Sequence, residues 1–176
     1  ISEALDTEID LTDEAAAHKE SVVREGKIEF RHVSFRYYKK NHEKALNDIS
    51  FTIKPGQTVG IIGSTGSGKT TLVQMIPRLY DVDEGAVFVD GVNVKDYSLK
   101  NLRNGVSMVL QKNVLFSGTI LENLRWGDEH AGEAEIQKAA IAAQADAFVS
   151  QLPEGYETEL GQGGVNVSGG QKQRLC

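Results

Sequence analysis

Cysteine is almost absent from this chain of 176 residues, and its single thiol, Cys176, cannot form an internal disulfide. A disulfide scaffold is therefore excluded, as is a zinc site built on several cysteines. We expect a reducing, cytosolic environment. Long apolar runs are missing as well, because the longest, 139–143, is far shorter than the roughly 18 residues that a membrane-spanning helix needs. The N-terminal residues also lack the basic and apolar regions of a secretory signal.

A basic surface is missing too. The net charge is −6, and all of it comes from residues 1–26, which hold eight acidic and two basic side chains. Residues 27–176 hold 17 of each sign. Proteins that bind nucleic acids usually present a basic face, so we expect no nucleic-acid partner. We interpret the acidic segment 1–26 as a solvated linker.

The hydrophobic pattern predicts an α/β protein with a nucleotide-binding core and a helical insertion. Alternating apolar residues indicate strands in the first part of the chain, with a bulge between Phe30 and Val33. The short apolar runs at 59–62 and 106–110 are typical of buried strands. Asp90-Gly91 predicts a hairpin turn. The other expected strands are 28–37, 46–53 and 86–89, and the expected helices are 69–79, 120–125 and 133–148.

The strongest motif is GSTGSGKT at 63–70, which matches G-x-x-x-x-G-K-[ST] between an expected strand and an expected helix. Its glycines let backbone N–H groups curl around phosphate oxygens, and the helix N-terminus adds partial positive charge. The motif predicts a nucleoside triphosphate with Mg²⁺. Lys69 should reach the β- and γ-phosphates, which also makes it a catalytic candidate, and Thr70 should bind Mg²⁺. The predicted phosphate-binding residues are Gly63, Ser64, Thr65, Gly66, Ser67, Gly68, Lys69, Thr70 and Thr71, the last at the α-phosphate.

A second acidic site is not evident. P-loop ATPases also need an aspartate at the end of an apolar strand to anchor Mg²⁺. Residues 86–90 approximate that pattern, but Gly91 follows Asp90 and favours the hairpin interpretation. We therefore expect this chain to lack both the magnesium aspartate and the catalytic glutamate.

Residues 167–174 (VSGGQKQR) resemble the LSGGQ signature motif of ATP-binding cassette (ABC) ATPases, with Val167 in the position of the leucine. Ser168 can cap a helix that begins at the glycines, and that helix end can offer N–H groups to an anion. The resemblance implies ATP as the nucleotide. It also implies that Ser168, Gly169, Gly170 and Gln171 contact the γ-phosphate held by a second copy of the domain.

Two further positions fit the same family. Gln111, after the expected strand 106–110, resembles the Q-loop glutamine, which implies contacts to Mg²⁺ and to the attacking water, and hence a part in catalysis. Tyr37 resembles the A-loop aromatic residue that stacks on adenine. The alternative for Tyr37 is packing within the sheet, and Tyr38 is a competing neighbour.

Two stretches resemble exporters that fuse a membrane domain to the ATPase, of the multidrug or lipid exporter type. The first is NVLFSGTI at 113–120, followed by Glu122 and Asn123. The second is TELGQGG at 158–164, which is similar to the exporter x-loop, commonly TEVGERG. Gln162 and Gly163 replace the usual Glu and Arg, so the salt bridges of those two side chains are not available here.

The resemblance implies three parts: a linker from a preceding transmembrane domain (1–26), a RecA-like ATP-binding core with an N-terminal antiparallel β-subdomain (27–111), and a helical subdomain truncated at the signature helix (112–176). The expected function is the ATPase domain of an ABC exporter at the cytoplasmic face of a membrane. Its expected partners are a second nucleotide-binding domain, arranged head to tail, and its own transmembrane domain.

The chain also lacks the switch histidine that the family uses, so we expect it to bind ATP weakly and to hydrolyse it inefficiently. We expect poor packing of the chain on its own, because the family places further strands beside the one before the P-loop. Two alternatives stay open, a soluble ABC ATPase and a non-hydrolysing half of a heterodimer. A nucleotide kinase is disfavoured by the VSGGQ segment.

Overall fold

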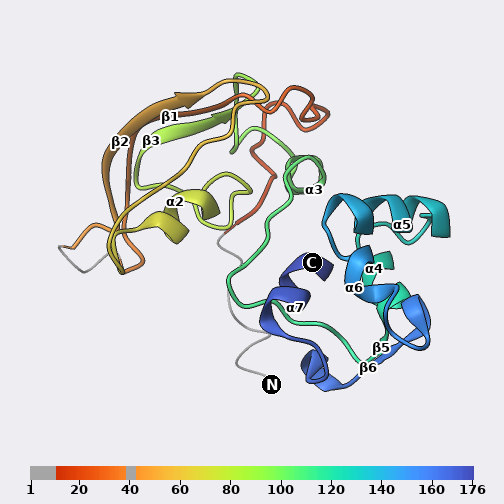
Figure 1. Cartoon of the computed structure of the whole chain (residues 1–176). Coiled ribbons are helices and arrows are strands. Elements are labelled where there is room, and N and C mark those ends of the chain that lie inside the picture. Colours follow the sequence, from red (N-terminus) through yellow and green to blue (C-terminus); the bar gives the residue numbers. More distant parts are fainter. Residues whose placement is uncertain (1–10, 39–42) are drawn as a thin grey trace, which may run out of the picture. The chain divides into compact units, whose positions relative to one another are not determined.

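The computed structural model describes residues 11–38 and 43–176. The chain forms two compact units, Ile1–Ser107 and Met108–Cys176, which we call the N-terminal unit and the C-terminal unit (Figure 1). Within the described residues, every helix is too short or too polar to cross a membrane. Each unit has its own hydrophobic core.

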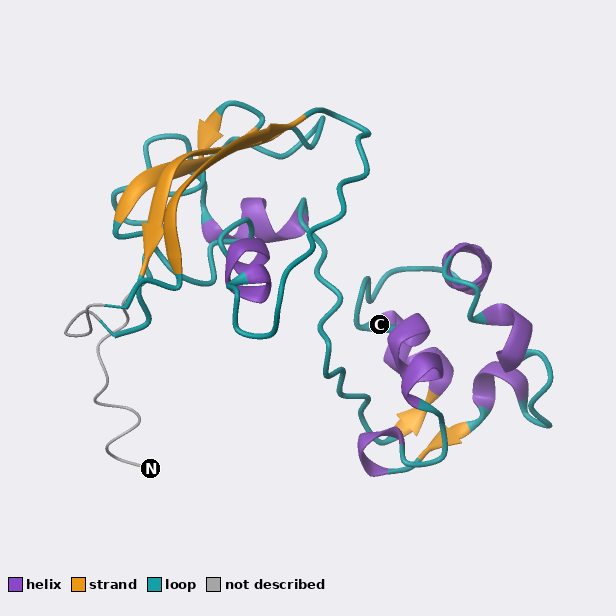
Figure 2. Cartoon of the chain, turned by 60° about the vertical axis from the view of Figure 1, so that its left-hand side comes forward, coloured by secondary structure: helices purple, strands orange, loops and turns teal. Residues whose placement is uncertain are grey.

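The N-terminal unit is built on an antiparallel sheet of four strands in the order β2-β1-β3-β4 (Figure 2). These strands are β1 (Ile28–Phe35), β2 (Leu46–Ile53), β3 (Glu84–Val89) and β4 (Val92–Asn93). The strands expected at 28–37, 46–53 and 86–89 are therefore confirmed, with small changes at their ends. The hairpin expected at Asp90-Gly91 joins β3 to β4.

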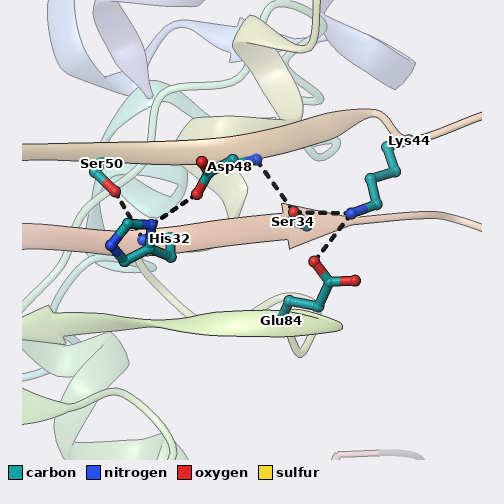
Figure 3. Close-up of polar contacts among 6 residues, drawn as sticks. All are labelled: His32, Ser34, Lys44, Asp48, Ser50 and Glu84. Atoms are coloured by element: carbon teal, nitrogen blue, oxygen red, sulfur yellow. Dashed lines mark hydrogen bonds and ion pairs between the residues drawn. The ribbon is translucent and has the colours of Figure 1, made fainter.

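The bulge expected in β1 is also confirmed, because the register with β2 shifts between Phe30 and Val33. Polar side chains tie the strands together there (Figure 3). The Ser34 hydroxyl accepts hydrogen bonds from the backbone N–H of Asp48 at 3.1 Å and from the Lys44 ammonium at 3.2 Å. Lys44 also pairs with Glu84 on β3 at 2.9 Å. Ser34 and Lys44 thus link β1, the start of β2 and β3 beyond the shift.

The core of this unit lies between the sheet and two short helices, α2 (Lys69–Gln74) and α3 (Leu99–Asn104) (Figure 2). Helix α2 ends earlier than the expected 69–79, and turns follow it to Leu79. Proline disfavours helical backbone in the residue before it, so Pro77 accounts for the early end. Helix α3 was not predicted from the sequence. The most deeply buried core residues are Phe30, Val33, Val87, Val89, Met75, Tyr97 and Leu102.

Two strand predictions are wrong for this structure. Residues 59–62 and 106–110 form no strand, and their apolar side chains are largely exposed, up to 98% for Ile62. A strand of this kind forms by hydrogen bonding to neighbours, and within the described residues no strand pairs with either segment. The apolar side chains that precede the P-loop are therefore exposed, but they lie in irregular backbone and not at the edge of a sheet.

The C-terminal unit is mainly helical. Its expected helix 120–125 is confirmed, and Thr119 and Glu122 form a capping box at its start. The expected helix 133–148 is split in two, because Gln144 adopts a positive φ of 57° between the halves. A small antiparallel pair joins the two ends of the unit. Its elements are β5 (Gly118–Thr119), α4 (Ile120–Arg125), α5 (Glu133–Ala142), α6 (Asp146–Val149), η1 (Gly155–Glu157), β6 (Glu159–Leu160), η2 (Gln162–Gly164) and α7 (Gly169–Leu175).

The described part of the acidic segment, 11–26, contacts the rest of the N-terminal unit, although most of its residues are exposed to solvent. The backbone N–H of His18 donates to the Asp96 carbonyl at 2.8 Å, and the amide of Asn101 donates to the Lys19 carbonyl at 2.8 Å. Val23 packs against the core of the unit. Residues 1–10 lie outside the described residues. The role of this segment as a linker stays a prediction.

Candidate functional site

The loop 63–68 curls around the side chain of the lysine that follows it. The Lys69 ammonium donates to the carbonyls of Gly63 at 2.9 Å and Ser64 at 2.7 Å, and it lies 3.3 Å from the Ser67 hydroxyl. Gly66 has a φ of 81°, a left-handed conformation that glycine adopts without strain. The loop is therefore curled, as the motif predicts, and Lys69 donates to two of its carbonyl groups.

Gly68 is the N-cap of α2 and cannot be replaced by a larger residue without rearrangement. Its φ is 84°, and an added Cβ would lie 2.5 Å from the backbone oxygen of Ala45. No side chain caps the helix start. The first turn of α2 therefore keeps backbone N–H groups without a side-chain acceptor, which is what an anion requires.

A pocket of about 490 Å³ opens beside this loop. Its size lies within the range of small-molecule sites, roughly 300–1,000 Å³. One wall is the loop and the start of α2, residues 66–71, and the other is made of Tyr37, Tyr38 and residues 43–45. Backbone amides, hydroxyl groups and an ammonium thus share one pocket with two aromatic rings.

Tyr37 is fixed at both ends of its side chain. Its hydroxyl lies 2.9 Å from the Thr71 hydroxyl and donates to the Gln74 side-chain oxygen at 3.4 Å. Its ring packs at right angles to the rings of Phe35 and Tyr80. Tyr37 is still 47% exposed. The sheet-packing alternative and the base-stacking interpretation are therefore compatible, because the ring packs on Phe35 and lines the pocket.

The pocket also bears on Mg²⁺ binding. Within the described residues no cluster of three histidine, cysteine or carboxylate side chains could hold a metal by itself. Mg²⁺ prefers oxygen ligands and usually keeps several waters beside substrate phosphates. Thr70 and the carboxylate of Glu43 line the pocket. These donors fit a metal that arrives with a phosphate ligand.

Asp90 is a structural residue, as the hairpin interpretation predicts. Its φ is 51° and that of Gly91 is 81°, which suits a tight turn between strands. Its carboxylate accepts backbone N–H bonds from Arg24 at 2.7 Å, Glu25 at 3.0 Å and Lys27 at 2.8 Å. Burial of the Asp90 carboxyl opposes its ionisation, but these backbone hydrogen bonds outweigh burial and lower its pKa. The carboxylate thus anchors the acidic segment.

The signature-like residues lie together at the start of α7. The Ser168 hydroxyl accepts from the backbone N–H of Gln171 at 3.2 Å, and the Gln171 side chain accepts from the N–H of Ser168 at 2.8 Å. This capping box confirms Ser168 as a helix cap. Gly169 and Gly170 are exposed, and an added Cβ at either would contact nothing within 4 Å.

Gln111 is not part of either cluster. It lies in an exposed segment without regular structure at the start of the C-terminal unit, and the strand expected before it is absent. Tyr37 and residues 63–71 belong to the N-terminal unit, whereas Gln111 and Ser168 belong to the C-terminal unit. The structure thus brings Tyr37 to the P-loop and brings Ser168 to Gln171.

Sequence analysis missed two residues at the site. Lys44 lines the pocket and is fixed by Glu84 of β3. Tyr80 packs on Tyr37 although more than 40 residues separate them in the chain. No spacing in the sequence points to either residue, because each is placed by a contact with a residue distant in the chain.

Known proteins match this chain closely. A profile of the family described as "ABC transporter" matches residues 46–176. A Bacillus subtilis protein named "Uncharacterized ABC transporter ATP-binding protein YfiB" is 49% identical over 175 residues, which are 99% of this chain and 30% of that protein. A second B. subtilis protein, "Putative multidrug export ATP-binding/permease protein YgaD", is 48% identical over 93% of this chain and 28% of its own length.

A solved structure is similar as well. It is described as the structure of a bacterial Atm1-family ABC exporter with ATP bound, and it matches with a TM-score of 0.90 and 35% sequence identity. The match covers 98% of this chain and 30% of that one. The chain thus spans about 30% of the length of the relatives that it matches.

Proposed function

The chain belongs to the ABC transporter family, and on that premise we propose that it is the ATP-binding and ATPase domain of an exporter. The relatives named as export ATP-binding/permease proteins support this, because they join an ATP-binding part and a permease in one chain. The domain would work at the cytoplasmic face of a membrane, with residues 1–26 leading from its transmembrane domain. Its core would span 27–111 and its helical subdomain 112–176.

The observation that carries the proposal is the loop 63–68 curled beside the pocket of Tyr37. Lys69 would exchange its bonds to the carbonyls of Gly63 and Ser64 for bonds to the β- and γ-phosphates of ATP. Such charge-assisted hydrogen bonds are the stronger kind. Thr71 would contact the α-phosphate, and Tyr37 would stack on the adenine.

Thr70 would hold Mg²⁺ together with phosphate oxygens, and Gln111 would approach the metal and the attacking water. The metal would draw charge from the phosphates during hydrolysis. The pocket supplies few carboxylates of its own, so most of the metal's ligands would come from ATP and water. Thr70 and Gln111 would orient the metal, and Lys69 would neutralise charge on the γ-phosphate.

A second nucleotide-binding domain would complete the site. Residues Ser168, Gly169, Gly170 and Gln171 of one domain would meet the γ-phosphate held by the loop 63–68 of the other, head to tail. Closing the pair would move the attached membrane helices, and hydrolysis would release them. Part of the support is the exposure of 168–170, which leaves this helix start accessible in the C-terminal unit.

This chain should bind ATP weakly and hydrolyse it slowly by itself. The one aspartate that approximates the magnesium-anchoring pattern, Asp90, accepts three backbone N–H bonds, from Arg24 and Glu25 of the acidic segment and from Lys27. It is therefore not available to hold Mg²⁺. Efficient turnover needs an aspartate at the end of an apolar strand beside the P-loop, and within the described residues no strand ends there in such an aspartate.

Calorimetric titration of MgATP tests the proposal. Lys69→Ala should weaken ATP binding by about tenfold or more, because it removes a charge-assisted interaction worth roughly 1.5–3 kcal/mol. Lys54→Ala is the matched control, since Lys54 is an exposed lysine of the same unit outside the pocket. Equal affinity of both variants and the original chain would rule out the P-loop as the site. Rapid ATP turnover that Lys69→Ala abolishes would overturn the expectation of slow hydrolysis.

A further inference from the structure

We propose that Tyr80 is a positioning residue for the nucleobase, which it orients by holding the ring of Tyr37. The proposal rests on the proposed ATP site and adds a residue that does not touch the nucleotide. Tyr80 is not among the residues that line the pocket. Tyr80 contacts Tyr37, which does line the pocket.

Three aromatic rings form a closed triangle at this place. The ring centroids of Tyr37 and Tyr80 lie 5.3 Å apart, with their planes at 89°. Those of Phe35 and Tyr37 lie 5.0 Å apart at 80°. Tyr80 and Phe35 complete the triangle at 5.4 Å and 46°. All three pairs lie within the distance and angle range that favours edge-to-face or tilted aromatic contact.

The hydroxyl end of Tyr37 is held separately. Thr71, which is only 6% exposed, contacts that hydroxyl at 2.9 Å, and Gln74 accepts from it at 3.4 Å. Both residues belong to α2, whose first residue, Lys69, closes the P-loop. The Tyr37 side chain is thus held at its hydroxyl by the phosphate-binding helix and at its ring by Phe35 and Tyr80.

Tyr80 contacts both of the other aromatic rings. Phe35 is buried in the core of the sheet, whereas Tyr80 is 40% exposed. Removing the Tyr80 ring should leave the core in place and release one side of Tyr37. A stacked base contributes roughly five- to 150-fold in affinity, and that gain requires a platform already fixed in orientation.

The test compares two ligands, MgATP and magnesium tripolyphosphate, which has the phosphate chain without a base. Tyr80→Leu should weaken MgATP about three- to tenfold, as expected for partial loss of a base stack. Its affinity for tripolyphosphate should stay within about twofold, because the P-loop contacts are unchanged. Tyr80→Phe should restore MgATP binding, since the aromatic contacts do not need the hydroxyl.

The outcomes separate this proposal from the one on which it rests. A Tyr80→Leu variant that weakens both ligands equally would mean a general structural role, and one that binds MgATP as tightly as the original chain would mean no role. If the original chain binds neither ligand, the proposed ATP site itself fails. Phe88→Leu is the control for loss of a ring, because Phe88 packs against the Arg31 guanidinium in the same unit and lies outside the pocket. If Tyr80→Leu does not fold, Tyr80→Met can replace it. The expected loss of affinity is then again larger for MgATP than for tripolyphosphate.

Discussion

Two glycine-rich segments lead into helices in this protein, and they satisfy their backbone polar groups in opposite ways. In the N-terminal unit, Gly68 caps α2 without a side-chain hydrogen bond. The Lys69 ammonium there donates hydrogen bonds to two carbonyl groups of the loop. The backbone N–H groups at the start of α2 have no side-chain acceptor. In the C-terminal unit, Ser168 and Gln171 cap α7 reciprocally, so both of those amides are already paired.

The rest of the second segment is also closed by side chains. Asn166 accepts from the backbone N–H of Gly161 at 3.2 Å and donates to the Glu159 carbonyl at 2.8 Å. The Lys172 ammonium donates to the Gly163 carbonyl at 2.7 Å. Glycine content alone therefore does not identify a phosphate loop. What separates the two segments is whether side chains cap the start of the helix that follows.

The largest expected difference comes from adding one methyl group to each segment. Gly68→Ala should destabilise the protein by at least about 2 kcal/mol, because it forces alanine into a left-handed conformation against the Ala45 carbonyl. Gly169→Ala should change stability by less than about 1 kcal/mol, because an added Cβ there meets nothing within 4 Å. Chemical denaturation of the two variants measures the difference.

MgATP binding by the same two variants gives a second measurement. Gly68→Ala should also abolish MgATP binding, because the first turn of α2 would move. Gly169→Ala should leave binding to the single chain unchanged. Similar stability losses in both variants would mean that the two helix starts are equivalent, which would refute the contrast drawn here.

A smaller difference is expected from the serines. Ser168→Ala should cost about 1 kcal/mol, the typical effect of removing a helix N-cap. Ser67→Ala should cost less than about 0.5 kcal/mol, because the Ser67 hydroxyl only contacts the Lys69 ammonium and caps nothing. Urea unfolding followed by circular dichroism can resolve the two. A larger loss for Ser67→Ala would show that the first segment also depends on a side-chain cap.

The sequence predicted strands well where their partners are antiparallel and supplied by this chain. Strand β1 pairs with β2 on one side and with β3 on the other, so all three alternating patterns are satisfied in one sheet. The equally apolar runs 59–62 and 106–110 predicted strands that did not form, because no described strand pairs with them. An apolar run indicates only that burial of its side chains is favourable. It does not indicate whether a neighbouring strand is present to pair with it.

Helices and site residues follow the same rule. The P-loop was predictable because one continuous stretch of backbone performs its chemistry. The split between α5 and α6 was not, because it depends on the single positive φ of Gln144. Helix α3 was missed although Ser98 caps it, since its six residues show too little periodicity. Tyr80 reaches the site only through the folded sheet.

The two units should also differ in how their stability depends on pH. The C-terminal unit should respond at alkaline pH. Burial, followed by the hydrogen bond to Asp146 at 2.7 Å, raises the pKa of Tyr156 in the C-terminal unit to about 12. Because the folded pKa exceeds the unfolded value of about 10, the stabilisation is complete below that pH and is lost as pH rises toward 12. Trp126, the single tryptophan, lies in this unit and reports its unfolding by fluorescence.

Tyr156→Phe is the variant for this measurement. It should be less stable than the original chain at neutral pH, because it lacks the hydrogen bond to Asp146. The difference in free energy of unfolding between the two chains should become smaller above about pH 10, where the original chain loses the stabilisation from Tyr156. A gap that stays constant up to strongly alkaline pH would show that the phenol does not ionise on unfolding.

The smallest effect is expected on the acid side, in the N-terminal unit. The pKa of Asp90 is lowered, so its stabilisation is present above the ordinary carboxyl value of about 3.9 and is lost as pH falls through the folded pKa. Asp90→Asn keeps an oxygen acceptor and tolerates the positive φ, so it should cost little stability at neutral pH and should make stability less dependent on pH in the acid range.

Hydrogen exchange of β3 and β4 amides at about pH 6 and about pH 3 compares the Asp90→Asn variant with the original chain on either side of the ordinary carboxyl pKa. Because the anchored N–H groups belong to residues 24–27, the loss of protection should spread to that segment and leave α7 unaffected. Equal acid sensitivity of α7 would mean that the two units unfold together, and the contrast between them would then hold for local structure but not for stability.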